Sequence, residues 1–224
     1  MPAFDFDMYQ RAQCLNYQGK GESAIKMLAE CLRQDPDNST AAKLMKLIRR
    51  SEALKKGGND AYGAGKYEAA LEAYRTALAL DPANKTFNSR ILCNCAVVLF
   101  KQSNFGEAVG KCNASLAADE SYFKAYRLRA TCYMKMGDAD SIGRAIRDYS
   151  RAKELLGAAG APATVSPVKE QLREIEEHLN NAQSALKKLK STKAILTSQD
   201  PVTGATLTGF QALINRPRIN LEVR

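Results

Sequence analysis

Residues 51–82 of this chain read SEALKKGGNDAYGAGKYEAALEAYRTALALDP. Gly58 and Ala70 lie 12 positions apart in this stretch, Tyr74 follows four positions later, and Pro82 closes it. Where two antiparallel helices cross, only Gly or Ala lets the backbones approach closely, and larger side chains fill the space beside the crossing. Proline cannot continue a helix, so it ends the second one. The stretch therefore predicts a helix-turn-helix pair.

The spacing of small residues recurs before and after this stretch. The further pairs are Ala12 and Ala24, Ala96 and Ala108, and, with three extra residues between them, Ala130 and Ala145. Such recurrence is typical of repeat architectures. The pattern resembles the tetratricopeptide repeat, and this resemblance implies an all-α fold, a right-handed superhelix of helix-turn-helix repeats.

We expect four repeats, a capping helix and a tail. Leu172, Ile175 and Leu179 begin an apolar stripe at helical spacing after the Gly- and Pro-rich loop of residues 157–165. A repeat array needs such a terminal helix with one polar side. The expected boundaries are 5–38, 51–84, 89–120 and 123–156 for the repeats, 166–190 for the capping helix and 191–224 for an irregular tail.

The predicted repeats are longer than the usual period of about 34 residues, so the extra residues need a place. Residues 38–50 carry apolar side chains at helical spacing, which predicts that the next helix begins early and is long. Residues 85–88 have the same effect on a smaller scale. We assign the last extra residues to a turn over residues 137–143.

The composition of the 224 residues argues against several classes of protein. Six cysteines form no Cys-x-x-Cys pair and the single histidine, His178, has no ligand-like neighbour, so we expect reduced packing cysteines, no metal and no cofactor. No apolar run approaches the roughly 18 residues of a membrane span, and the acidic N-terminus is unlike a secretory signal. We therefore expect a soluble protein of the cytoplasm or nucleus.

The formal net charge of +9 favours an anionic partner. Much of the positive charge lies in residues 43–56, 127–151 and 187–193. A basic adaptor for RNA is one alternative, but stacking aromatic side chains do not alternate with these charges as a single-strand groove requires. We do not expect an enzyme, because no Gly-rich phosphate loop follows a strand and the only histidine lies on the capping helix.

The candidate site consists of polar residues on the first helices of successive repeats. They are Lys55, Asn59, Asn94, Lys101, Lys124 and Arg127. The two residues on each helix lie within one or two turns of each other, and the superhelix brings these helices together along one concave groove. Cations and amides there suit a pair of carboxylates, because charge-assisted hydrogen bonds are strong. A peptide's C-terminus beside an acidic side chain offers such a pair.

This array resembles the dicarboxylate clamp of co-chaperone tetratricopeptide domains. The family's Lys-x-x-x-Asn segment is seen here from Lys55 to Asn59, and its Asn-x-Ala segment from Asn94 to Ala96. The resemblance implies that the groove holds the C-terminal Glu-Glu-Val-Asp of heat-shock protein 70 and heat-shock protein 90. The alternative is a general interaction scaffold whose groove takes a different peptide.

The third segment of the clamp departs from the family pattern. It reads Lys124-Ala-Tyr-Arg-Leu-Arg129, so Leu128 stands where the family has Arg. Arg127 is the candidate substitute because it lies three residues from Lys124 on a neighbouring face, whereas Arg129 points away. If neither arginine reaches the ligand, binding is weaker by roughly ten- to a hundredfold.

Residues 5–190 are similar to tetratricopeptide co-chaperones of the DnaJ family, which end in a J domain. The likeness includes the phrases SYFKAY at residues 121–126 and AIRDY at residues 145–149. The His-Pro-Asp motif by which a J domain stimulates ATP hydrolysis by heat-shock protein 70 is absent, since His178 is followed by Leu179. We therefore interpret the chain as a truncated gene product or an isoform that binds chaperones without stimulating them.

Overall fold

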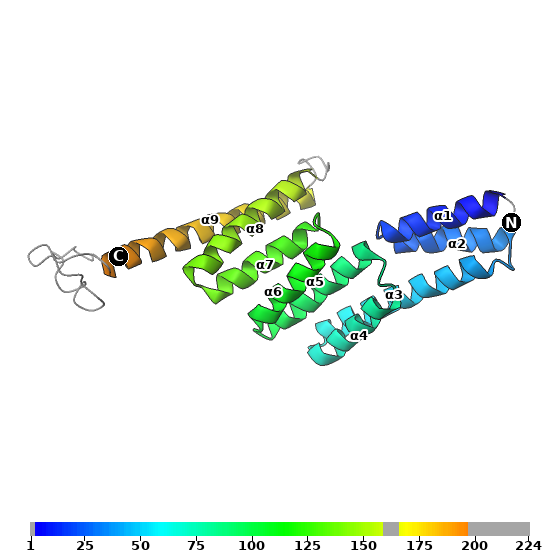
Figure 1. Cartoon of the computed structure of the whole chain (residues 1–224), viewed down its shortest axis with the longest axis horizontal. Coiled ribbons are helices and arrows are strands. Elements are labelled where there is room, and N and C mark those ends of the chain that lie inside the picture. The colour runs from blue at the N-terminus through cyan, green and yellow to red at the C-terminus, as the bar shows by residue number, and fades with distance from the viewer. Residues whose placement is uncertain (1–2, 159–165, 197–224) are drawn as a thin grey trace, which may run out of the picture.

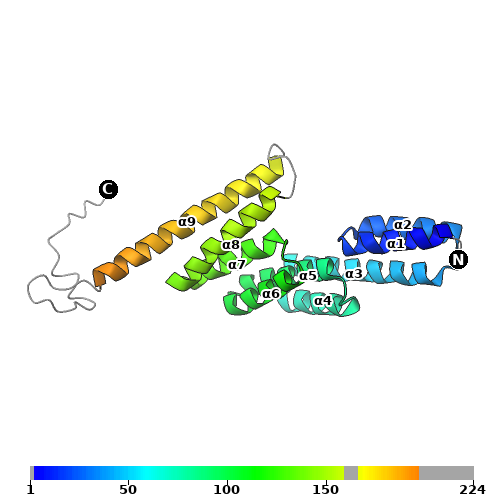
Figure 2. The ribbon, with the colours of Figure 1, turned by 45° about the horizontal axis from the view of Figure 1, so that its top comes forward.

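The computed structural model describes residues 3–158 and 166–196, and each of its elements is an α-helix (Figure 1). The helices are α1 (Ala3–Tyr17), α2 (Gly21–Gln34), α3 (Ser39–Gly63), α4 (Tyr67–Leu80), α5 (Lys85–Lys101), α6 (Phe105–Ala118), α7 (Phe123–Met136), α8 (Ala139–Ala158) and α9 (Ser166–Leu196). The first eight pack as four consecutive pairs, and α9 packs against α8. The pairs follow one another along the long axis, with α1 and α2 at one end and α9 at the other (Figure 2). The predicted all-α array of repeats is confirmed.

The small residues lie at the helix crossings, as predicted. The side chains of Ala12, Ala24, Ala96 and Ala108 are 0% exposed. A Cβ atom at Gly58 would clash with the ring of the buried Tyr74. Since glycine leaves that space empty, α3 and α4 approach closely enough for the tyrosine ring to fill the crossing.

Helix α3 is long because it belongs to two packing units. Its first half contributes Ala41 and Ile48 to the cluster around α1 and α2, and its second half packs Leu54 against the cluster around Tyr74. The Asn38 side chain caps its first turn by accepting a hydrogen bond from the Ala41 amide at 3.0 Å. The prediction of an early and long helix after residue 38 is confirmed, and α5 likewise begins at residue 85.

Two sequence expectations are corrected. The extra residues of the fourth repeat do not form a turn over 137–143, because α8 begins at Ala139 and only two residues separate it from α7. Gly137 adopts φ +81°, which reverses the chain in that short space. The tail does not begin at residue 191, because α9 continues to Leu196. The Ser191 and Thr192 hydroxyls donate to the carbonyls of Lys187 and Lys188, so these residues are accommodated within the helix.

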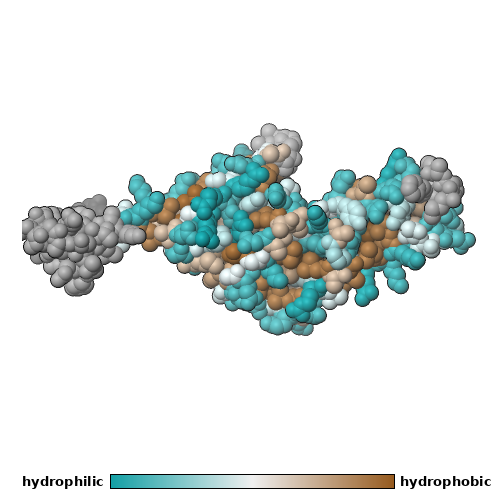
Figure 3. Space-filling view, viewed as in Figure 1, coloured by the Kyte–Doolittle hydropathy of each residue, from teal (hydrophilic) through white to brown (hydrophobic). Residues whose placement is uncertain are grey.

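The capping helix covers the last repeat with the predicted stripe. Ile175 and Ala182 are fully buried in one cluster with Tyr149 and Ala152 of α8. On the face in Figure 3, hydrophobic surface gathers along the middle of the array and hydrophilic side chains cover its margins. The expected loop at 159–165 and the rest of the expected tail at 197–224 lie outside the described residues.

The cysteines fill the repeat core, except for the exposed Cys14. Cys112 and Cys132 pack with Ala96 and Ala108 in one buried cluster. Burial raises the pKa of the Cys93 thiol to about 11, which makes it a poor nucleophile at neutral pH. Among the helices described, none has the length and apolar character of a membrane span.

Candidate functional site

The amide part of the predicted site is a contact between α3 and α5. The Nδ2 atom of Asn94 donates to Oδ1 of Asn59 at 3.2 Å. The same Oδ1 accepts a hydrogen bond from the Tyr74 hydroxyl at 2.7 Å. Burial raises the pKa of Tyr74 to about 12, so its hydroxyl remains a donor at physiological pH. Two asparagines 35 residues apart in the sequence are thereby fixed side by side.

Lys55 lies one turn before Asn59 on α3, and its charge has two neighbours. Its ammonium pairs with the carboxylate of Glu52 on the same helix. It also lies 5.6 Å from the centre of the Phe87 ring on α5. Lys55 therefore faces α5, as Asn59 does, but its side chain is held by these partners.

Next to the amide pair, a cleft of about 350 Å³ opens between α5, α7 and α9. Its lining residues are Cys93, Asn94, Val97, Tyr122, Lys124, Arg127, Leu128, Thr131, Glu174 and His178. Asn94, Lys124 and Arg127, which the sequence placed in the candidate site, meet here. Two cations and an amide at one cleft can bind a carboxylate by charge-assisted hydrogen bonds.

The cationic residues of α7 differ in their surroundings. Lys124, in the first turn of the helix, is exposed. Arg127 forms an ion pair with Glu174 of α9 at 2.8 Å. Arg129 points away from the cleft, as expected, because its guanidinium binds both carboxylate oxygens of Asp148 at 2.7 Å. Its pKa is raised above the ordinary arginine value by this contact.

Lys101 lies at the C-terminal end of α5 and is exposed. It is not among the described residues that line the cleft. The structure therefore brings Asn59, Asn94, Lys124 and Arg127 into one region, with Lys55 at its edge, and leaves Lys101 two turns beyond Asn94 along α5.

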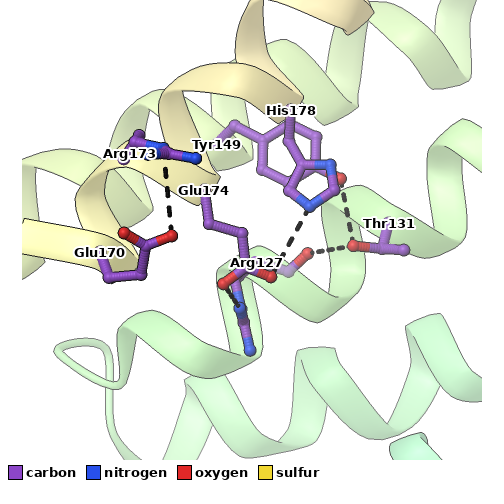
Figure 4. A network of polar contacts seen from close by, with 7 residues as sticks. All are labelled: Arg127, Thr131, Tyr149, Glu170, Arg173, Glu174 and His178. Atoms are coloured by element: carbon purple, nitrogen blue, oxygen red, sulfur yellow. Dashed lines mark hydrogen bonds and ion pairs between the residues drawn. The ribbon is translucent and has the colours of Figure 1, made fainter. Parts of the chain in front are cut away.

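The polar contacts that α9 makes with α7 and α8 were not predicted from the amino-acid sequence (Figure 4). The His178 ring stacks on the Tyr149 ring with centres 5.5 Å apart, and its Nε2 atom lies 3.8 Å from a Glu174 oxygen. The Tyr149 and Thr131 hydroxyls are 3.1 Å apart, and Thr131 donates to the Arg127 carbonyl at 2.9 Å. The one available signal was the four-residue spacing of Glu174 and His178, which places both on one face of α9.

Within residues 3–158 and 166–196, no group of three His, Cys, Asp or Glu side chains is arranged to hold a metal ion. The neighbours of Glu174 are Arg127 and His178.

Comparisons with known proteins agree with this architecture. Residues 58–103 match the family model described as TPR repeat, the tetratricopeptide repeat. The chain is 30% identical over 208 residues to DnaJ homolog subfamily C member 7 of Mus musculus, a match that covers 89% of this chain. This chain is a tetratricopeptide-repeat protein homologous to DnaJ homolog subfamily C member 7. The match covers 42% of the mouse protein, so this chain corresponds to less than half of it.

Two further comparisons concern a second relative and a solved structure. DnaJ homolog subfamily C member 7 homolog of Dictyostelium discoideum is 34% identical over 148 residues, which are 66% of this chain and 27% of that protein. The crystal structure of the P58(IPK) tetratricopeptide domain has a TM-score of 0.63 at 20% identity, covering 85% of this chain and 48% of that one. The match to the P58(IPK) domain supports the helical-repeat fold of this tetratricopeptide protein.

Proposed function

We propose that this tetratricopeptide protein is a co-chaperone-like adaptor that binds the acidic C-terminal peptide of heat-shock protein 70 or 90 chaperones. One observation carries the proposal. Asn94 and Lys124 line the same cleft although they come from different repeats, and Asn94 is bonded to Asn59 of a third helix. The homology to DnaJ proteins and the clamp-like spacing of the same residues support a chaperone as the source of the peptide.

In this proposal the chain end is held by its carboxylates. The Lys124 ammonium is exposed and can turn toward an oxygen of the ligand, while the Asn94 amide offers its second N–H. A hydrogen bond to a charged group is worth about 1.5–3 kcal/mol, so each such contact strengthens binding of the peptide by roughly ten- to a hundredfold. At the edge of the site Lys55 is paired with Glu52, so contributions from Lys55 and from Lys101 stay predictions.

The proposal includes the cellular compartment in which the protein acts. Five of the six cysteines are buried, and buried thiols are typical of proteins from reducing compartments. We therefore place the activity in the cytoplasm or nucleus, where a chaperone peptide would be met.

A peptide titration tests the proposal. Fluorescence anisotropy with a labelled peptide ending in Glu-Glu-Val-Asp is expected to give saturable binding, and amidation of its C-terminus is expected to weaken that binding at least about tenfold. Lys124→Ala is expected to weaken binding by a similar factor. Circular dichroism should be unchanged, because this side chain is exposed.

Lys46→Ala is the matched control. This exposed lysine lies nine residues before Lys55, about two and a half turns, on the opposite side of α3. It removes the same charge without touching the groove, so binding should stay within twofold. Equal affinity for the free and amidated peptides would reject the clamp. Binding to RNA that falls steeply with salt would instead favour the basic adaptor.

A further inference from the structure

The predicted substitute arginine already has a carboxylate partner inside the protein. The Arg127 guanidinium contacts Glu174 at 2.8 Å, and their side chains are 35% and 48% exposed. A ligand approaching along the cleft meets this pair at the surface. Its own carboxylate must either replace Glu174 or lie beside it.

The position of Glu174 is fixed by the packing of α9. Ile175, the next residue, is fully buried. His178, one turn further, stacks on Tyr149 with the two rings 10° from parallel. Since both contacts hold this turn of α9 against α8, the helix cannot withdraw Glu174 from Arg127 without losing core packing.

The charges that line the cleft therefore suit one carboxylate and oppose a second. Lys124 and Arg127 are its cations and Glu174 is its anion, which leaves one net positive charge when His178 is neutral. Of the two cations, only Lys124 has no carboxylate partner among the described residues. At the edge of the site, Lys55 is likewise paired with Glu52.

We propose that Glu174 determines the ligand specificity of this groove. Because of Glu174, the groove recognises the terminal carboxylate of a polypeptide chain. It has little preference for a second carboxylate on the side chain of the last residue. This inference rests on the proposed function and specifies which carboxylate of the ligand's last residue the groove recognises. Without Glu174, Arg127 would be available to the second carboxylate and the preference for a final aspartate would be strong.

Two peptides that differ only in their last residue test the inference. Both have a free C-terminal carboxylate. One ends in Glu-Glu-Val-Asp and the other in Glu-Glu-Val-Asn. The wild-type protein is expected to bind them with dissociation constants within threefold of each other. In Glu174→Gln, which keeps the shape of the side chain, we expect the aspartate peptide to bind about five- to tenfold more tightly than the asparagine peptide.

Two further variants separate specificity from altered packing. Glu176→Gln removes the same charge from α9 and breaks an exposed ion pair with Lys153 of α8 at 3.0 Å, but it does not touch the cleft. It should leave the wild-type ratio of affinities unchanged. Adding Arg127→Ala to Glu174→Gln should return the ratio to within threefold, because the second carboxylate then has lost its partner.

The outcomes are distinct. The same ratio in wild type and Glu174→Gln, with both proteins binding free but not amidated peptides, overturns the inference and leaves the proposed function standing. Binding by Glu174→Gln alone would show that the wild-type groove does not accept such peptides, which overturns the proposed function and the inference that rests on it. Absence of binding by both proteins overturns the proposed function and the inference with it.

Discussion

The two ends of the groove are built on the same position of the repeat but present different chemistry. Tyr74 in the second repeat and Tyr149 in the fourth are both buried, and their hydroxyls are hydrogen-bonded to polar side chains of the site, Asn59 and Thr131 respectively. Beside Tyr74, the neighbouring helix is the first helix of another repeat, and it contributes an amide, Asn94. Beside Tyr149, the neighbour is α9, and it contributes a carboxylate, Glu174. The repeat fixes where polar groups meet, whereas the neighbouring helix decides their charge.

The largest expected effect concerns Tyr74, the buried ring at the first end of the groove. Tyr74→Ala should lower the free energy of unfolding by about 3–5 kcal/mol, because it leaves a cavity at the crossing of α3 and α4 and removes the partner of Asn59. Urea denaturation followed by circular dichroism measures this. Tyr17→Ala, which alters a tyrosine that is 41% exposed, should change it by less than about 0.5 kcal/mol. A loss below 1 kcal/mol for Tyr74→Ala would contradict the packing described here.

The second prediction removes the amide from the first end of the groove. Asn94→Ala should weaken binding of the Glu-Glu-Val-Asp peptide about tenfold, because a hydrogen-bond donor to the ligand is lost and Asn59 loses its neighbour. Its helical circular-dichroism signal should match that of the wild type. Anisotropy titration at constant salt measures the affinity, and unaltered binding would exclude Asn94 from the site.

The smallest effect is expected at the second end. Replacing the pair together, Arg127→Ala with Glu174→Gln, should weaken binding of the same peptide by less than threefold, because the two charges cancel each other and the cleft keeps one net positive charge. The measurement is the same titration, so the two ends of the groove are compared directly. A loss as large as that of Asn94→Ala would mean that the ligand displaces Glu174 freely, and the contrast between the two ends would disappear.

Much of the repeat array is predictable because its signals are local. The spacing of Gly58 and Ala70 indicates a helix crossing, and the apolar residues after Asn38 indicate the early start of α3. The ends of α8 and α9 are not predictable in this way. Residues such as Asp138, Ser191 and Thr192 favour turns by their own preference, but in this protein they cap a helix or hydrogen-bond within one.

The candidate site is also predictable only where its residues follow the spacing of the repeats. Lys55 and Asn59, or Asn94 and its repeat neighbours, can be placed on one groove because successive repeats share a register. Arg127 could be named as a candidate but its partner could not. Glu174 lies 47 residues away on a helix outside the repeat pattern, and no spacing rule relates the two.

The amino-acid sequence by itself determined the repeats, their helix crossings and the helices that face the groove, because each depends on side-chain size and spacing within about 40 residues. Only the tertiary structure decided the charge of the groove. The free energy of burying Ile175 and stacking His178 on Tyr149 sets the rotation of α9, and that rotation places Glu174 on Arg127. A single helix that packs by its apolar side thus sets the charge that its polar side presents to the cleft.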